Sequence, residues 1–300
     1  MVPPGRTSPP AWVERLQALA LPVFGSRRVT RARAVIDRYN AADGGLLAAG
    51  IAYNTLFAII PMALFGGAIL GFFVTDPGSL ATVRAALTDW APPLSSVIDE
   101  ILGGLSSASP TLSVVGFLGM IWGATRLFAS LEIGIEAMFS EAPRRGIVVR
   151  TLRRVGSVLI VAGLVVGAFL AASVASFVSE LTAGDEGGPI RTAFLALLLA
   201  LPSVVTSAAL VLVYQLVPPV HPSRSAVLLP AVTIGVGLVL LTRLFAVVAP
   251  RALGANFVYG TLGAIFVALA WLGLAYSIIL LGAAWVRERM LAAQDTAPVA

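Results

Sequence analysis

Six runs of about 20 apolar residues constrain the fold of this chain more than any other feature. A run of that length is long enough to cross the hydrocarbon core of a bilayer as one helix. Four of the runs contain no charged residue, and the second and fifth contain one arginine each, Arg126 and Arg243. We therefore predict an all-α, polytopic membrane protein with six transmembrane helices. The predicted spans cover residues 46–74, 111–128, 155–179, 193–217, 226–249 and 257–286.

The composition favours a membrane protein over a soluble one. Apolar residues make up 58% of the chain and charged residues 12%, against about 45–50% and about 25% in soluble domains. All 20 basic residues are arginines, and with 15 acidic residues the net charge is +5. A chain this basic is also compatible with nucleic-acid binding, but only if the arginines gather on one soluble face.

The arginines instead fall mostly on one side of the predicted spans. Fifteen lie before span 1, between spans 2 and 3, between spans 4 and 5, or after span 6, and three lie in the opposite segments. Because cytoplasmic segments carry the excess of basic residues, both termini are predicted to be cytoplasmic and no nucleic-acid partner is expected. No secretory signal peptide is recognised before the first span, which is expected to remain in the mature protein.

The chain divides into a basic N-terminal segment (1–45), a transmembrane domain (46–286) and a short cytoplasmic tail (287–300). Within the first segment, apolar residues recur at helical spacing at Val29, Ala32, Ile36 and Tyr39. Such an amphipathic helix can lie along the inner leaflet and pair with anionic headgroups. It can equally be a solvated flank that only sets the orientation of span 1.

The loop between spans 1 and 2 is long enough to carry structure on the outer side. Ser79 can cap a helix that Pro92 and Pro93 end, and a second short helix is predicted over 94–105. We predict a net acidic helical hairpin that covers the outer mouth of the bundle. Packing is the preferred role, and ligand binding is the alternative.

Charged residues inside a span are by default candidates for function. Arg126 lies near the predicted cytoplasmic end of span 2, and Arg243 about two turns from the outer end of span 5. Both side chains can therefore reach the headgroups by snorkelling. If either faces the interior, an anionic substrate or a lipid phosphate is the natural ligand.

Pro61, in the middle of span 1, adds a second kind of candidate. Transporters use broken helices to expose backbone groups at a substrate site, although kinked helices without transport are also frequent. Asn54 shares a helix face with Pro61, and further polar residues open span 6. The complete candidate polar site comprises Asn54, Pro61, Arg126, Arg243, Asn256, Tyr259 and Thr261.

Catalysis finds little support in the sequence. The chain has no cysteine and a single histidine, His221, which leaves almost nothing for thiolate, metal or imidazole chemistry. Motifs of metalloproteases, serine hydrolases and phosphate-binding loops are not found. We expect a protein that is not an enzyme and has no metal or cofactor.

Several segments resemble one known family. Residues 47–61 (LAAGIAYNTLFAIIP) are similar to the opening helix of the YihY/BrkB family of bacterial inner-membrane proteins. Residues 94–109, followed by 119–125 (GMIWGAT), resemble the family's outer helices and second span. The most specific block is YGTLGA at 259–264, and the resemblance covers roughly residues 39–288. Two departures are Asn54, where the family usually has an aromatic or small residue, and Ala284, where it generally has Glu.

The resemblance implies six membrane helices and a bacterial inner-membrane location, but no reaction. Members were once labelled as a tRNA-processing ribonuclease (ribonuclease BN), and others carry a virulence label that names a phenotype. This chain lacks the His/Asp cluster of a metal-dependent nuclease, so ribonuclease activity is not expected. We expect a transporter or lipid translocator, in contact with anionic lipids, and the alternative is a non-transporting envelope scaffold. The sequence leaves its oligomeric state open.

Overall fold

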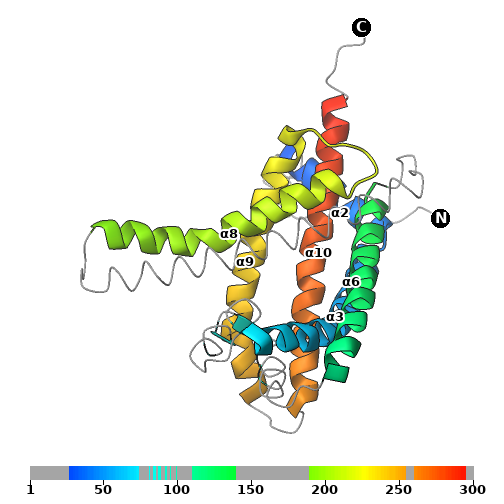
Figure 1. Cartoon of the computed structure of the whole chain (residues 1–300). Coiled ribbons are helices and arrows are strands. Elements are labelled where there is room, and N and C mark those ends of the chain that lie inside the picture. The colour runs from blue at the N-terminus through cyan, green and yellow to red at the C-terminus, as the bar shows by residue number, and fades with distance from the viewer. Residues whose placement is uncertain are drawn as a thin grey trace, which may run out of the picture.

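The structure is a computed structural model that describes residues 27–73, 110–139, 189–254 and 260–294, with isolated residues between 81 and 99. The long described stretches are helical apart from short turns and loops, and they contain no strand. Figure 1 shows the helices in their positions. They are α2 (Arg27–Ala41), α3 (Gly44–Phe73), α6 (Pro110–Ala137), α8 (Pro189–Leu216), α9 (Arg224–Gly254) and α10 (Gly260–Gln294).

Five of the six predicted spans coincide with α3, α6, α8, α9 and α10, and the predicted span 155–179 lies outside the described residues. Three of these helices contain stretches long and apolar enough to cross a membrane. A fourth is obtained if α2 and the start of α3, which meet at a bend of 62°, count as one broken span. The described part is therefore an all-helical membrane protein with three to four candidate spans. The three stretches are Gly116–Ala137, Arg224–Ala249 and Leu262–Gln294.

The helices α3 and α6 pack antiparallel at very short range. A Cβ atom added to Gly123 would lie 2.8 Å from the Cα atom of Ala58, and one added to Gly119 would lie 2.7 Å from the Cβ atom of Pro61. Glycines four residues apart allow two helix backbones to approach this closely. Gly119 and Gly123 of the second predicted span thus form its contact with the first.

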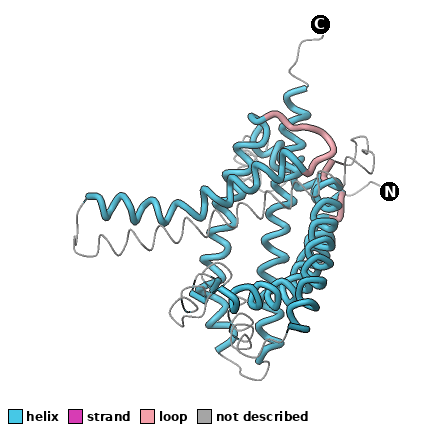
Figure 2. The backbone as a smooth tube through the Cα atoms, viewed as in Figure 1, coloured by secondary structure: helices cyan, strands magenta, loops and turns pink. Residues whose placement is uncertain are grey.

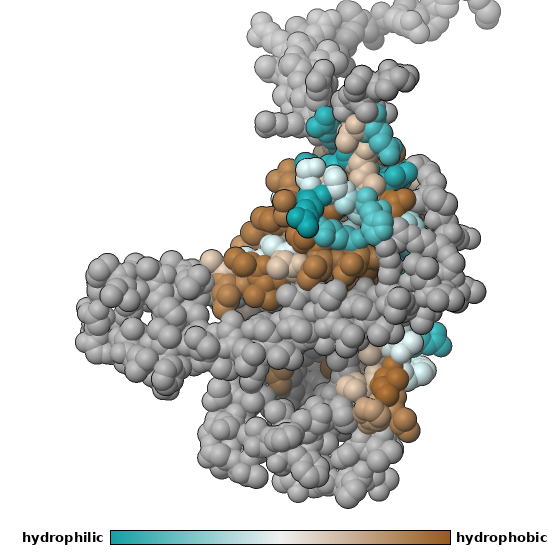
Figure 3. Space-filling view, turned by 45° about the horizontal axis from the view of Figure 1, so that its top comes forward, coloured by the Kyte–Doolittle hydropathy of each residue, from teal (hydrophilic) through white to brown (hydrophobic). Residues whose placement is uncertain are grey.

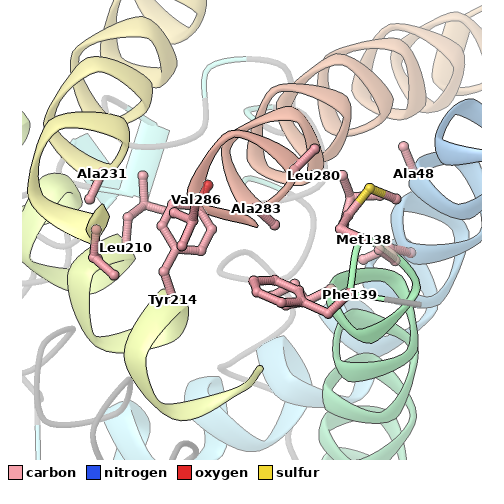
Figure 4. Packing of buried hydrophobic residues seen from close by; sticks show 13 residues of the cluster. Ala48, Met138, Phe139, Leu210, Tyr214, Ala231, Leu280, Ala283 and Val286 are labelled. Atoms are coloured by element: carbon pink, nitrogen blue, oxygen red, sulfur yellow. The ribbon is translucent and has the colours of Figure 1, made fainter. Parts of the chain in front are cut away.

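A buried apolar core joins α3, α6, α8 and α10 near one end of the bundle. Figure 4 shows the Tyr214 ring beside Val286 and Ala283, with Met138 and Phe139 on the side of Leu280 and Ala48. The Tyr214 hydroxyl would be an isolated polar group here, but it donates a hydrogen bond to the Ile279 carbonyl oxygen at 2.7 Å. This bond allows a tyrosine to be completely buried at the contact between α8 and α10.

The helices α8 and α9 form a hairpin connected by the short segment 217–223. They meet where buried Ser207 lies against Gly235, and a Cβ atom at Gly235 would lie 2.9 Å from the Ser207 Cα atom. Figure 1 shows that the first half of α8 projects away from α9, α10 and α6. The second half of α8, from about Ala200, therefore makes the described contacts with the bundle.

A sharp turn separates α2 from α3. Asp43 adopts a left-handed conformation with φ of 51°, which Asp tolerates better than most residues. The Asp43 N–H bonds the Asn40 carbonyl, and the Asp43 carbonyl accepts the Leu47 N–H, both at 3.0 Å. Asp43 therefore ends one helix and begins the next. Figure 2 shows the described backbone as long helices joined by short loops.

The helix α2 packs against the bundle through a different stripe from the one expected. Val35 and Tyr39 contact the buried core, whereas Ala32 and Ile36 are exposed. The Arg38 Nε atom, next to this stripe, donates to the Glu288 carboxylate of α10 at 2.6 Å. Docking on α10 therefore selects the Val35 and Tyr39 side of α2, and Ile36 is left on its outer face.

Polar and apolar residues separate along the described surface. In Figure 3, hydrophobic residues form a broad band, and hydrophilic residues gather above it toward the end of the bundle that carries the last turns of α10. This arrangement is typical of a protein whose middle faces lipid and whose end faces water.

The predicted outer hairpin falls mostly outside the described residues. Among its described residues are Arg84 and Asp99, and the Arg84 Nε atom donates to the Asp99 carboxylate at 2.6 Å. Both side chains are exposed. The ion pair brings together the two segments that the sequence predicts as the arms of the hairpin.

Candidate functional site

The helix that carries Arg126 extends further beyond this residue than the sequence indicates. The predicted span ends at residue 128, but α6 continues to Ala137, where Ile135 is fully buried in the core. Within α6, which begins at Pro110, Arg126 is 16 residues from the first residue and 11 from the last. At about 1.5 Å per residue, roughly 24 Å of helix precedes Arg126 and roughly 16 Å follows it.

The Arg126 side chain is exposed, and its position seven residues after Gly119 places it beside the α3 contact of α6. Its guanidinium carbon lies 5.7 Å from the ring centroid of Trp122, one turn earlier, and Trp122 is itself 57% exposed. This is the distance of a cation–π contact. Within the described residues, no carboxylate forms an ion pair with Arg126.

Arg243 has a different position. It is exposed on α9, six residues before the end of the candidate span Arg224–Ala249. About 9 Å of helix separates it from that end, and an arginine side chain at such a depth can reach the headgroups. The location of Arg243 fits the snorkelling interpretation.

Pro61 and Asn54 are half-buried on α3. Pro61 lies against Gly119 of α6, so its described contact is with a neighbouring helix. Asn256 and Tyr259 lie outside the described residues, and Thr261 is in the first turn of α10 with a side chain that is not described. The structure shows no contact that joins the described members of the predicted polar site.

A polar contact between α3 and α10 was not predicted. The Thr55 Oγ1 atom lies 2.8 Å from the Tyr276 hydroxyl and 2.7 Å from the Ile51 carbonyl oxygen. About one turn away, the Trp271 Nε1 atom is buried without a hydrogen-bond partner. Because Thr55 and Tyr276 are 221 residues apart, no local pattern in the sequence indicates that they meet.

Charged residues cluster where α10 ends. Arg287 is buried, Arg38 bonds Glu288, and the Arg289 Nη2 atom donates to the Ser225 carbonyl oxygen at 2.8 Å. These contacts attach α2 and the start of α9 to the last turns of α10.

The described residues contain no group of three or more His, Asp or Glu side chains placed to hold a metal ion. What the described site offers is one exposed guanidinium at mid-helix, beside an indole ring. A guanidinium can bind carboxylate or phosphate in a bidentate manner. The described arrangement is suited to binding an anion.

The comparisons with known proteins place this chain in a family. The sequence profile of the family described as virulence factor BrkB matches residues 35–299. The chain belongs to this family. The resemblance found in residues 39–288 is thereby confirmed.

Curated relatives of this BrkB-family chain are named UPF0761 membrane protein. The relative from Halorhodospira halophila is 32% identical over 242 residues, which is 78% of this chain and 51% of the relative. The relative from Chromohalobacter salexigens is 28% identical over 86% of this chain and 63% of its own length. The relative from Vibrio vulnificus is 25% identical over 88% of this chain and 84% of its own length.

The chain therefore spans between half and two thirds of the first two relatives. Their printed names describe membrane proteins and give no reaction. No solved structure matches the chain significantly. Membership in the BrkB family thus establishes a membrane protein, and the function depends on the site.

Proposed function

We propose that this protein is a transporter of the bacterial cytoplasmic membrane that moves an anionic substrate or an anionic lipid. It has six membrane spans, an outer helical hairpin and cytoplasmic termini, and it is not an enzyme. The supporting observation is Arg126, an exposed arginine within the candidate span Gly116–Ala137. A charged residue inside a span is costly in lipid and marks ion or substrate pathways.

The distribution of the other arginines also supports this proposal. The basic cytoplasmic segments attract anionic lipids, so a substrate with an anionic headgroup would be concentrated at the membrane surface beside α2. Arg126 then provides a positively charged group that binds the anion within the span. Such a group lowers the barrier that a charged substrate meets when it crosses the membrane.

The test is reconstitution of the full chain in vesicles. Movement of fluorescent phosphatidylglycerol between leaflets and efflux of small organic anions are measured against protein-free vesicles. Wild type is expected to accelerate one of the two processes, and Arg126→Gln is expected to reduce that rate about ten-fold, equivalent to about 1.4 kcal/mol. Arg251→Gln, at an exposed arginine near the end of α9, is the matched control and retains the rate.

Rates equal to those of protein-free vesicles for both substrate classes would exclude the proposal. A non-transporting scaffold of the envelope would then be favoured. That alternative predicts a stoichiometric partner in cross-linked membranes, captured with the full-length protein and identified by mass spectrometry.

A further inference from the structure

The start of α9 and the last turns of α10 lie side by side at one end of the bundle (Figure 1). Two arginines, one from each helix, come together there. Arg224 is the first residue of α9, and its side chain is exposed. The Arg289 Nη2 atom of α10 donates to the carbonyl oxygen of Ser225, the next residue of α9, at 2.8 Å. This bond holds the Arg289 guanidinium beside the turn that carries Arg224.

The positive charge of these two arginines is not compensated by nearby carboxylates. Within the stretches that the structure describes, neither Arg224 nor Arg289 forms an ion pair with a carboxylate. The Arg289 side chain is partly exposed, and its bond to Ser225 uses one of its five N–H donors. Its Nε atom is buried without a hydrogen-bond partner. Both guanidinium groups therefore retain donors for an external anion.

Two serine hydroxyls add neutral donors at the same place. The Oγ atoms of Ser223 and Ser225 lie 3.1 Å apart, and both residues are exposed. One of these hydroxyls donates to the other, so the proton of the accepting hydroxyl is free to bond an acceptor outside the protein. Phosphate oxygens accept hydrogen bonds from hydroxyls and, more strongly, from guanidinium groups.

An exposed apolar face of α9 begins directly after these polar groups. Leu228, Leu229 and Val232 follow Ser225 at i+3, i+4 and i+7, so they share its side of the helix. Their side chains are 47–51% exposed. All of them lie in the first turns of the candidate span Arg224–Ala249. The surface thus changes from positively charged at the end of the span to apolar within it.

We infer that the first turn of α9 and the last turns of α10 form a binding site, with Arg224, Ser225 and Arg289, for the phosphate of an anionic phospholipid. The headgroup lies at the end of the span, and an acyl chain covers Leu228 and Leu229. Basic pockets between transmembrane helices bind anionic headgroups at the membrane surface in this way. A zwitterionic headgroup binds less well because its own cation competes with the arginines. This site does not depend on transport, since the bound lipid stays in one leaflet.

The test is photo-cross-linking of lipids to the reconstituted full-length protein. Phosphatidylcholine vesicles contain a small fraction of phosphatidylglycerol with a photoreactive diazirine on the headgroup, and adducts are mapped by mass spectrometry. Adducts of wild type are expected within residues 223–232. Arg224→Gln should reduce them about five-fold, the factor that one arginine near the surface contributes to the affinity for anionic lipid. Arg224→Gln/Arg289→Gln should reduce them roughly 25-fold, the product of two such factors.

Three controls identify the ligand and the site. Arg31→Gln removes an exposed arginine of α2 at the same end of the bundle, and it should leave the adducts unchanged. A photoreactive phosphatidylcholine should give fewer adducts within 223–232 than phosphatidylglycerol. Inorganic phosphate, added at constant ionic strength, should not compete, because it makes no contact with the apolar face. Effective competition would assign the site to a soluble anion and overturn the inference.

Arg224→Gln is the decisive variant, because Arg289→Gln also removes a contact between helices. The structure describes no side-chain contact of Arg224, so the unfolding temperature of Arg224→Gln in detergent should equal that of wild type. If Arg224→Gln leaves the adducts within 223–232 unchanged, the inference is wrong. If Arg31→Gln reduces them as much as Arg224→Gln does, general surface charge attracts the lipid and the inference is also wrong. If the adducts depend on Arg224 but no substrate crosses the membrane, the lipid site stands and the transport proposal fails.

Discussion

At the scale of single residues, Arg38 and Glu288 connect segments that are 250 positions apart in the sequence. Their side chains are 14% and 21% exposed, so the ion pair is shielded from water on most sides. The Arg38 Nη1 atom also lies 3.5 Å from the Met138 carbonyl oxygen. One arginine of α2 thus contacts both α10 and the end of α6.

Removing either partner of this pair should destabilise the protein. Arg38→Gln is expected to cost about 1–3 kcal/mol, because Glu288 then loses a charged hydrogen-bond donor in a partly buried place. Thermal unfolding in detergent measures the effect. The double variant Arg38→Gln/Glu288→Gln should lose less than the sum of the single variants, and strict additivity would contradict a direct interaction. Arg31→Gln, at an exposed position of α2, is the control.

The sequence identified Arg126 as a candidate, but it did not show how far the helix extends beyond this residue. The apolar run ends before Glu132, so a span defined by composition alone stops near residue 128. The helix continues because Ile135, Met138 and Phe139 are buried against the core. Such tertiary contacts cannot be predicted from the hydropathy of the neighbouring residues in the sequence. The aromatic partner of Arg126 was detectable, since Trp122 precedes it at the i, i+4 spacing of helix neighbours.

At the scale of helices, the crossing of α3 and α6 depends on glycine. The backbone at Ala58 occupies the space that a side chain at position 123 would need. By contrast, a Cβ atom at Gly237 of α9 would meet no atom within 4 Å. The sequence showed the glycine spacing in several spans, but it did not indicate which neighbouring helix each pair contacts.

These two glycines provide a matched pair of substitutions. Gly123→Ala should lower the unfolding temperature, because the methyl group forces the two helices apart. Gly237→Ala should leave it unchanged or raise it slightly, since Ala is favoured over Gly in a helix by about 0.5–1 kcal/mol. Differential scanning fluorimetry in detergent compares the variants. Equal effects at both positions would contradict the close crossing of α3 and α6.

The Arg84–Asp99 contact is expected to make the stability of the outer segment depend on pH. The hydrogen bond from Arg84 holds the pKa of the Asp99 carboxyl below its ordinary value. A carboxyl whose pKa is lowered in the folded state stabilises that state above its ordinary pKa of about 3.9, and this stabilisation is lost as the pH falls through the lowered pKa.

The difference in unfolding temperature between wild type and Asp99→Asn is therefore expected to be small but measurable at neutral pH, and to vanish in acid. The size is limited because both side chains are exposed. Thermal scans at several pH values provide the measurement. If the difference in unfolding temperature between wild type and Asp99→Asn instead increased toward low pH, the Arg84–Asp99 contact would not be its cause.

At the scale of the whole molecule, the arginine distribution and the arrangement of the helices together predict which end of the bundle faces the cytoplasm. The end of the bundle that holds the last turns of α10 is the hydrophilic end in Figure 3. It is also the side on which the sequence places most arginines. The general arrangement was predictable because spans and charge asymmetry are local properties of the sequence, whereas the docking of α2 on α10 depends on distant contacts.

Because the chain has no cysteine, single engineered cysteines can test this orientation. Gln294→Cys and Ser223→Cys are expected to react with a membrane-impermeant maleimide only after the membrane is permeabilised. Ala85→Cys, in the outer loop, is expected to react in intact cells whose outer layers admit the reagent. All three positions are exposed, and labelling of Gln294→Cys in intact cells would place the C-terminus on the wrong side.

The ion pair between α2 and α10 also has a consequence for biosynthesis. Arg38 leaves the ribosome long before Glu288, and at about 5–20 residues per second the delay is roughly 12–50 seconds. During that interval, α2 has no α10 to dock on, and its basic face can be held by the headgroups of the inner leaflet. Completion of the last helix then releases α2 from the lipid surface and closes the bundle. A chain truncated before Glu288 would remain in the open, surface-attached state, in which membrane proteases can recognise it.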